Sequence, residues 1–158
     1  MESLDRILFL ILNRELVNPV FDAVMPFVTE MDHWRIPILL VWLLLFIFGG
    51  RKGRITALLA VVTLTLSDQI SSSVVKPWIG RIRPCFVLEG ARLLIDQPGS
   101  PSFPSSHAAN MAAMAVLFSF KYPGWKAVFI SIAVLVAGSR VYVGVHYPSD
   151  VLGGAAIG

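Results

Sequence analysis

Ionisable side chains gather near the end of this chain, inside a segment that is otherwise apolar. The stretch GSRVYVGVHYPSD, residues 138–150, contains Arg140, His146 and Asp150. A charge inside a bilayer is costly, so ionisable residues in apolar segments generally mark a functional site. Asp150 follows His146 by four residues, so it can reach one imidazole nitrogen and leave the other bare. The pattern indicates nucleophilic catalysis by a histidine that a carboxylate orients.

Two further segments supply cations and the start of a helix: KPWIGRIRP and SFPSSHAAN. Lys76, Arg83 and Arg140 provide a positive field suited to a phosphate dianion, which the two arginines can contact in a bidentate manner. A helix that begins at Pro104-Ser105-Ser106 adds free backbone N–H groups and the positive end of a dipole. With His107 in its first turn, the chain offers one histidine for attack and one for proton transfer.

Each segment also has a structural interpretation when it is taken alone. Cations at the end of a span often contact lipid headgroups, and serine and proline are ordinary residues at helix starts. A histidine at a membrane interface is often simply hydrogen bonded. Phosphate chemistry is favoured because all three segments together fit it. No metal or cofactor is expected, because the chain has three histidines and no carboxylate cluster, and His33 lies in a different, Trp-flanked turn.

The composition is that of an integral membrane protein. The 158 residues are 56% hydrophobic and 15% charged, with a mean hydropathy of +0.73, which is more apolar than a small soluble domain can bury. The net charge of +3 is modest and the basic residues form short clusters, so no nucleic-acid partner is expected. The single cysteine, Cys85, excludes an intramolecular disulfide. Met1 to Leu12 lacks a small-residue cleavage site, so no cleavable signal peptide is expected.

We expect an all-α, polytopic transmembrane bundle of about six helices in one domain, residues 1–158, because about 20 apolar residues cross a bilayer core. Residues 1–33 are expected to form one or two amphipathic helices at the interface, with a tilted span as the alternative. A helix from Pro148 to Gly158 reaches only about 16 Å, so the chain is expected to continue in the natural protein. The other core spans are expected at approximately Trp34 to Gly50, Ile55 to Val75, Ser105 to Phe120, and Trp125 to Val145.

Short basic loops predict the orientation of these spans. RKGR at Arg51 to Arg54 and KYPGWK at Lys121 to Lys126 are an even number of spans apart, so they lie on one side. The positive-inside rule makes that side cytoplasmic. The connections from Lys76 to Pro104 and from Val141 to Pro148 then share the opposite side, which holds nearly all the unusual polar residues.

The residues resemble the type 2 phosphatidic acid phosphatases, a superfamily that also includes the vanadium haloperoxidases and glucose-6-phosphatase. The family pattern has three parts, K-x6-RP, PSGH and SR-x5-H-x3-D. Lys76 with Arg83-Pro84 matches the first part, and Pro104 to His107 matches the second except that Ser106 replaces glycine. Ser139-Arg140, with the histidine and aspartate that follow at the family spacing, matches the third. The close match covers residues 67–154, and the first sixty residues match only as membrane-helix material.

The resemblance implies an all-helical membrane core and metal-independent phosphoester hydrolysis through a phosphohistidine. It implies that His146 is the nucleophile, that Asp150 orients it and that His107 is the general acid. Glycine lets a backbone approach phosphate closely, so Ser106 either narrows the pocket or contributes its hydroxyl. The implied phosphate cradle comprises Lys76, Arg83, Ser105, Ser106 and Arg140.

Two further charges are expected to act from outside the cradle. Asp68, Ser72 and Lys76 are spaced by four residues on one helix face, so Asp68 either supports Lys76 through Ser72 or binds a neighbouring helix. Arg81 is expected to touch a substrate diphosphate or a lipid headgroup.

Two other functional classes fit part of this pattern. A transporter or an anion-binding membrane protein also places charges on one side of a bundle, but it needs no histidine–aspartate pair, and the chain shows no twofold hydropathy repeat. The haloperoxidases are water-soluble, unlike this chain. The expected substrate is a phosphate-bearing membrane lipid, such as undecaprenyl diphosphate, phosphatidylglycerol phosphate, phosphatidic acid or lipid A 1-phosphate. The protein is expected in the inner (plasma) membrane, with its site on the periplasmic side.

Overall fold

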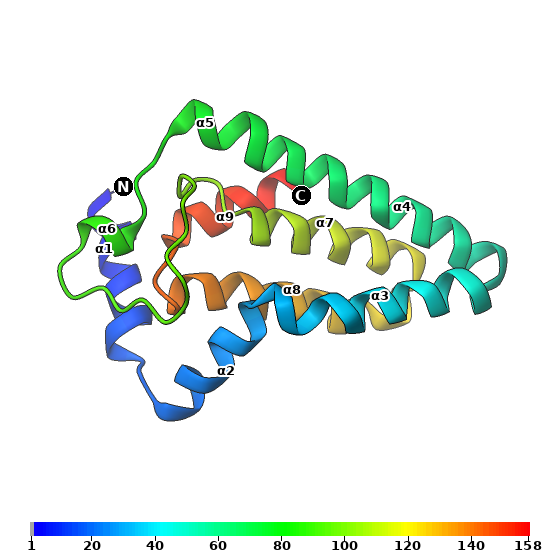
Figure 1. The fold of residues 1–158 in the computed structure, drawn as a ribbon, viewed down its shortest axis with the longest axis horizontal. Coiled ribbons are helices and arrows are strands. Elements are labelled where there is room, and N and C mark those ends of the chain that lie inside the picture. The colour runs from blue at the N-terminus through cyan, green and yellow to red at the C-terminus, as the bar shows by residue number, and fades with distance from the viewer. Residues whose placement is uncertain (1) are drawn as a thin grey trace.

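The structure, a computed structural model, describes residues 2–158 as a bundle of helices (Figure 1), and that range contains no β-strand. This confirms the predicted all-α architecture. Two π-helical segments and one short 3₁₀ segment interrupt or join the α-helices: η1 (Ile11–Glu15), η2 (Gln69–Val75) and η3 (Pro123–Trp125). The α-helices are α1 (Glu2–Leu10), α2 (Pro19–Thr29), α3 (Met31–Phe48), α4 (Gly50–Asp68), α5 (Lys76–Ile79), α6 (Pro84–Val87), α7 (Ser106–Lys121), α8 (Lys126–Tyr142) and α9 (Pro148–Ile157).

Three helical segments are long and apolar enough to cross a membrane: Met31–Phe48, Gly50–Val87 and Pro123–Tyr142. The first of these, α3, has no buried residue at all, and its large apolar side chains face outward. In water such a surface would be unstable, whereas lipid accommodates it. Three of the four predicted spans correspond to these segments to within a few residues, except that the second helical run extends from Gly50 to Ile79. The span predicted from Ser105 to Phe120 corresponds to α7, which has 16 residues and is not among these three segments.

Small residues bring the helices close together around α7, which packs against α4, α8 and α9. Lipid provides no hydrophobic force between helices, so membrane bundles depend on close approach of backbones at small side chains. Every buried residue of α7 is an alanine, and the buried residues of α4 are also small. They are Ala108, Ala109, Ala113 and Ala115 on α7, and Gly53, Thr56, Ala57, Ala60 and Ser67 on α4.

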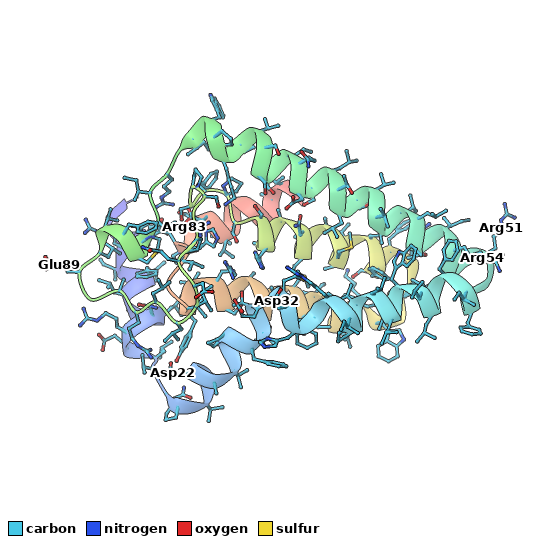
Figure 2. The ribbon with its side chains drawn as sticks, viewed as in Figure 1. Asp22, Asp32, Arg51, Arg54, Arg83 and Glu89 are labelled. Atoms are coloured by element: carbon cyan, nitrogen blue, oxygen red, sulfur yellow. The ribbon has the colours of Figure 1, made fainter. Side chains whose placement is uncertain are left out.

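The two basic segments lie at the same end of the bundle, as predicted, although Arg51 to Arg54 belong to the start of α4 and do not form a loop. The Nζ atom of Lys52, in the first segment, lies 4.6 Å from the ring centre of Tyr122, in the second. Arg51 and Arg54 mark this end in Figure 2, and Arg83 lies toward the other end. The loops that carry the three motifs therefore lie at the end of the bundle opposite to the two basic segments.

The N-terminal segment forms separate short helices instead of one tilted span. Glu2–Leu10 and Ile11–Glu15 together have 14 residues, or about 21 Å of helix, which is less than a bilayer core of about 30 Å. The stripe that packs onto the bundle consists of Asp5, Phe9 and Asn13, while Ile7 is exposed. Most of the apolar residues of this segment therefore face outward, whereas Phe9 and the two polar residues of the stripe hold it against the bundle.

The position predicted for His33 is wrong. This residue lies in the first turn of α3, and its ring stacks on Phe27 of α2 with centroids 4.7 Å apart. The helix begins directly after Glu30 and continues through Pro37, so no separate turn forms around the histidine.

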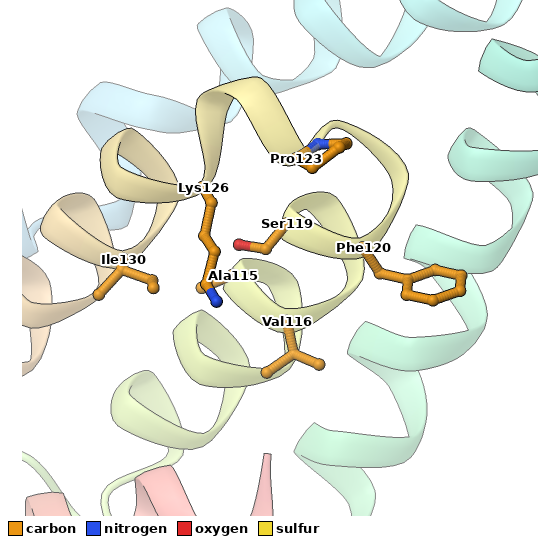
Figure 3. Close-up of a pocket in the computed structure, with 7 residues that line it drawn as sticks. All are labelled: Ala115, Val116, Ser119, Phe120, Pro123, Lys126 and Ile130. Atoms are coloured by element: carbon orange, nitrogen blue, oxygen red, sulfur yellow. The ribbon is translucent and has the colours of Figure 1, made fainter.

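A groove opens far from the motif residues, between the C-terminal half of α7 and the start of α8 (Figure 3). Ser119 and His107 are twelve residues apart on α7, which corresponds to about 18 Å along the helix axis. The groove is mostly apolar and none of the predicted site residues lines it. Its lining residues are Ala115, Val116, Ser119, Phe120, Pro123, Lys126 and Ile130.

Candidate active site

A tight turn between α8 and α9 presents His146, whose side chain is 2% exposed. The backbone N–H groups of Val145 and His146 both donate to the carbonyl of Arg140, at 3.2 and 3.3 Å. Gly144 adopts φ +93°, and a Cβ there would collide with the backbone oxygen of Arg92. Only glycine fits this conformation and this close approach, so the turn that positions His146 requires the glycine of GVHYP.

Asp150 lies beside His146, with a serine hydroxyl between them. The Oδ2 atom of Asp150 is 3.6 Å from Nδ1 of His146, which is longer than a direct hydrogen bond. The Oγ atom of Ser102 donates to Asp150 Oδ2 at 2.5 Å and lies 3.5 Å from His146 Nδ1. The structure brings the predicted pair together and adds Ser102 as the group that touches both members.

The N-terminus of α9 holds the Asp150 carboxylate in this position. The backbone N–H of Tyr147 donates to Asp150 Oδ2 at 2.8 Å, so Asp150 caps the helix in whose first turn it lies. Its other oxygen, Oδ1, lies 2.6 Å from Nη1 of Arg81. Both carboxylate oxygens therefore have strong donors, which fixes their orientation toward His146.

Arg81 contacts Asp150 directly, which the sequence did not predict. Its guanidinium also lies over the ring of Tyr147, 4.0 Å from the ring centre, and binds Asp5 of α1. We expected Arg81 to touch a substrate diphosphate or a headgroup. In the structure its side chain is partly exposed but its guanidinium is held by protein carboxylates.

Arg83 lies beside the second ring nitrogen of His146. Its Nη1 atom is 3.2 Å from His146 Nε2 and donates to the carbonyl of Val145 at 2.9 Å. The remaining donors reach the loop before α7: Nε donates to the carbonyl of Ser100 at 2.7 Å, and Nη2 to the Ser100 hydroxyl and the Pro101 carbonyl. Arg83 therefore joins two loops around the imidazole nitrogen that is not directed at Asp150.

Lys76 reaches the site after a change of helical register. Its Nζ atom donates to the carbonyl of Pro101 at 2.8 Å, and its side chain is almost fully buried. The π-helical segment η2 comes immediately before it and widens the turns between Asp68 and Lys76. The predicted regular spacing of Asp68, Ser72 and Lys76 is therefore interrupted, and Lys76 makes no hydrogen bond to Ser72.

Arg140 reaches the site from the last turn of α8. Its Nη1 atom donates to the hydroxyl of Thr29, at the end of α2, at 2.6 Å. Its Nε atom is buried and has no hydrogen-bond partner in the part of the chain whose side chains are described, residues 4–158. A buried donor without a partner is costly, and such groups often mark a place that a ligand fills.

The three cations share an unusual environment. Lys76, Arg83 and Arg140 are 5%, 3% and 6% exposed. Among residues 4–158, whose side chains the structure describes, no carboxylate lies within 4.0 Å of any of these three charged groups. Buried charges are normally paired, so this cluster has a deficit of negative charge that an anion would neutralise.

The N-terminus of α7 lies beside the same cluster. Ser105 is the N-cap, and its hydroxyl accepts from the N–H of Ala108 at 3.4 Å. The N–H of Ser105 donates to the carbonyl of Asp150 at 2.9 Å, so the starts of α7 and α9 are joined. His107 is half-buried in the first turn, where the charges of Arg140, Lys76 and Arg83 act on it.

Ser106, which replaces the family glycine, uses its hydroxyl inside the protein. Its Oγ atom lies 2.9 Å from Oγ of Ser72, which in turn donates to Asp68 Oδ1 at 3.3 Å. Asn110 of α7 also donates to Asp68 Oδ1, at 3.2 Å. Of the two expected roles of Asp68, the contacts show binding to a neighbouring helix, together with an indirect link to Ser106.

Burial keeps His146 neutral. Desolvation lowers the pKa of His146 to about 3, with the nearby Asp150 carboxylate acting in the opposite direction and the charges of Arg83 and Arg140 lowering it further. A neutral imidazole retains a lone pair on one ring nitrogen. The side chain is therefore in the protonation state that a nucleophile needs at neutral pH.

Three residues of this site were missed: Ser102, Thr29 and Asp5. Ser102 lies two residues before Pro104, and a serine in a serine-rich loop carries no signal of its own. Asp5 did have a signal, because it is an ionisable residue two positions before the apolar run that starts at Ile7. Among residues 4–158, no group of three or more His, Cys, Asp or Glu side chains is arranged to hold a metal ion.

Comparison with known proteins places this arrangement in a family. A sequence model described as the PAP2 superfamily matches residues 56–158. The chain is 30% identical to a lipid A 4'-phosphatase of Bacteroides thetaiotaomicron, over 89% of the chain and 66% of that protein. It is 33% identical to the undecaprenyl-diphosphatase BcrC of Bacillus subtilis, over 89% of the chain and 70% of that protein. The chain thus spans about two thirds of the length of these relatives.

A solved structure shows the same fold. It is the crystal structure of a transmembrane PAP2 type phosphatidylglycerolphosphate phosphatase from Bacillus subtilis, with a TM-score of 0.77 and 28% identity. The match covers 99% of this chain and 79% of the solved chain. These comparisons confirm the predicted family and the membrane character of the protein. The matched region contains all three motifs, and the chain belongs to the PAP2 superfamily.

Proposed function

We propose that this protein hydrolyses a phosphomonoester or diphosphate on a membrane lipid, without a metal, through a phosphohistidine. One observation carries the proposal: Lys76, Arg83 and Arg140 are buried near the neutral His146, and among residues 4–158 no carboxylate pairs with them. A phosphate dianion supplies the missing negative charge. The names of the relatives, which are lipid phosphatases and a diphosphatase, support the same class of reaction.

In the first step, the lone pair on Nε2 of His146 attacks phosphorus. The N–P bond forms, the bond between phosphorus and the lipid oxygen breaks, and His107 gives its proton to the departing oxygen. Asp150, with Ser102, holds Nδ1 and stabilises the positive charge that develops on the imidazole. Arg83 already donates toward Nε2, so an incoming phosphate oxygen takes over that N–H.

In the second step, water releases the phosphate. His107, now neutral, takes a proton from the water, whose oxygen attacks phosphorus while the N–P bond breaks. Inorganic phosphate and the original neutral His146 result. Arg140, whose Nε has no protein partner, and the N-terminus of α7 neutralise charge on the phosphoryl oxygens in both steps.

The substrate is a lipid whose phosphate lies in the leaflet next to this site. Relatives are named for lipid A, undecaprenyl diphosphate and phosphatidylglycerol phosphate. A site on the periplasmic face of the inner membrane is supported by the two basic segments at the opposite end of the bundle, through the positive-inside rule. The bundle acts as a single membrane domain.

The test is phosphate release by the purified protein in detergent with a metal chelator. Undecaprenyl diphosphate, phosphatidylglycerol phosphate, phosphatidic acid and lipid A 1-phosphate are each offered, and free phosphate is measured. We expect release from at least one lipid and none from a His146→Ala variant. If the protein binds orthovanadate but releases phosphate from none of the lipids, it is an anion-binding protein and the proposed hydrolysis is wrong.

A further inference from the structure

The N-terminal helix reaches the proposed active site through one carboxylate. Asp5 lies on α1, its side chain is 9% exposed, and its Oδ2 atom is 2.6 Å from Nη2 of Arg81. Its Oδ1 atom accepts from the backbone N–H of Ser149 at 2.9 Å, and Oδ2 also accepts from the Ser149 hydroxyl. All these partners lie on the loop after α5 or on the first turn of α9, so Asp5 joins three distant segments.

Arg81 transmits this contact to Asp150. Its guanidinium stands between the two carboxylates, with Nη2 on Asp5 and Nη1 on Asp150 Oδ1, both at 2.6 Å. Nη1 also donates to Ser149 Oγ at 2.7 Å. The ring of Tyr147 lies under the guanidinium and packs against Phe9, one turn after Asp5 on α1. The guanidinium is therefore held on several sides and has little freedom to turn.

The charges of Asp5, Arg81 and Asp150 together affect His146. If Arg81 had Asp150 as its only carboxylate, the full positive charge would compete with the imidazole for the charge of Asp150. A second carboxylate on Arg81 offsets that positive charge, so Asp150 remains able to stabilise the imidazolium. The group Asp5, Arg81 and Asp150 carries a net charge of −1, whereas Arg81 and Asp150 alone would be neutral.

We propose that Asp5 is a positioning residue of the active site, which acts through Arg81 to orient Asp150 and to preserve its negative charge for His146. The inference rests on the proposed function, because it assigns Asp5 a part in phosphorylation of His146. Asp5 lies outside the matched residues 56–158 and 144 positions before Ser149. The residues that hold the nucleophile in place therefore include one, Asp5, that lies outside the three motifs.

The competing explanation is that Asp5 only anchors the N-terminal segment, because Phe9 of α1 and Asn13 of η1 also pack onto the bundle. Asp5→Asn separates the two, because asparagine keeps an oxygen for the Ser149 N–H but removes the charge. Asp5→Glu restores the charge. The matched control is Glu15→Gln, which removes a charge from an exposed residue of the same N-terminal segment. Arg81→Gln, alone and with Asp5→Asn, tests whether Asp5 acts through Arg81.

The experiment measures kcat and KM for phosphate release, the affinity for orthovanadate, and thermal unfolding of the same samples. We expect Asp5→Asn to lower kcat on the order of 10-fold, as outer partners of reactive groups often do, with KM changed by less than about twofold. Orthovanadate affinity falls by a similar factor, Asp5→Glu recovers part of the loss, and Glu15→Gln matches the wild type. Asp5→Asn added to Arg81→Gln has little further effect, because coupled residues are not additive.

Other results separate this inference from the proposed function. If Asp5→Asn only lowers the unfolding temperature and keeps the wild-type kcat and orthovanadate affinity, Asp5 is an anchor and the inference is wrong. Additive losses in the double variant would overturn it as well. If the wild type binds orthovanadate but hydrolyses no lipid, the proposed function fails, and the affinity ratio of Asp5→Asn to wild type still decides the role of Asp5. A wild type that does neither contradicts both.

Discussion

Arg83 Nη1 lies 3.2 Å from His146 Nε2, the imidazole nitrogen that is proposed to attack phosphorus. A cation of the phosphate cradle therefore touches the nucleophile itself. Every N–H direction of this guanidinium has an acceptor within the protein. Arg83 consequently has two roles in the site. It holds the loop of Ser100 and Pro101 in place, and its positive charge attracts the anion to Nε2 of His146.

Arg140 offers a cleaner test of the cradle than Arg83. Its guanidinium donates to the Thr29 hydroxyl, and its buried Nε has no partner among residues 4–158, so Arg140→Lys removes the planar fork and disturbs few protein contacts. We expect kcat/KM to fall on the order of 100-fold while the protein still folds, since charge-assisted bidentate contacts are the strong ones. Phosphate release and thermal unfolding are measured together. Wild-type turnover by a well-folded Arg140→Lys protein would show that a point charge suffices.

Ser102 is predicted to contribute to the rate although it belongs to none of the three motifs. Ser102→Ala removes the hydroxyl between Asp150 and His146, so the imidazole is held less firmly. We expect kcat to drop on the order of 10-fold, with a stability loss of about 1–3 kcal/mol from the buried acceptor that loses its donor. Ser73→Ala, at an exposed serine bonded to Gln69, is the control and should behave as wild type. Unchanged kcat in Ser102→Ala would show that Asp150 orients His146 unaided.

The spans could be predicted from the sequence because each is a long apolar run, and the three motifs because their residues lie close in the chain. The details around them could not. Ser102 and Asp150 are 48 positions apart, and Asp5 and Ser149 are 144 apart, so only the packing of helices brings them together. Local spacing also failed at η2, where a π-helix replaced the regular turn expected between Asp68 and Lys76.

Acid is predicted to destabilise the protein through His146. A histidine in the unfolded chain has a pKa of about 6.5, whereas burial lowers the pKa of His146 to about 3. Between these values the unfolded state binds a proton that the folded state does not, so stability falls as pH falls below 6.5. The contribution is at most about 1.4 kcal/mol per pH unit. Chemical unfolding between pH 4 and 7 should show a shallower dependence in His146→Gln, and an equal slope in both proteins would contradict the buried neutral state.

The orientation can be checked with single cysteines in a Cys85→Ser background. Glu89 is exposed near the motif end of the bundle, and Arg51 is exposed at the other end (Figure 2). Gly90 is less suitable, because its positive φ of 75° would strain a cysteine. A membrane-impermeant maleimide should label Glu89→Cys in intact cells and Arg51→Cys only after lysis. The reverse pattern would place the site on the cytoplasmic face.

The most direct test of the whole account is rapid-quench detection of acid-labile phosphoenzyme with a ³²P-labelled aryl phosphate, in wild type, His146→Ala and His107→Ala. An aryl phosphate has a good leaving group and needs little help from a general acid, whereas such help is typically worth about 10²–10⁴-fold on a poor leaving group. We expect label in wild type, no label in His146→Ala, and label that forms but decays slowly in His107→Ala, because activation of water is impaired. Label that survives in His146→Ala, or that never forms in His107→Ala, would contradict the assignment of His146 as the nucleophile and His107 as the acid.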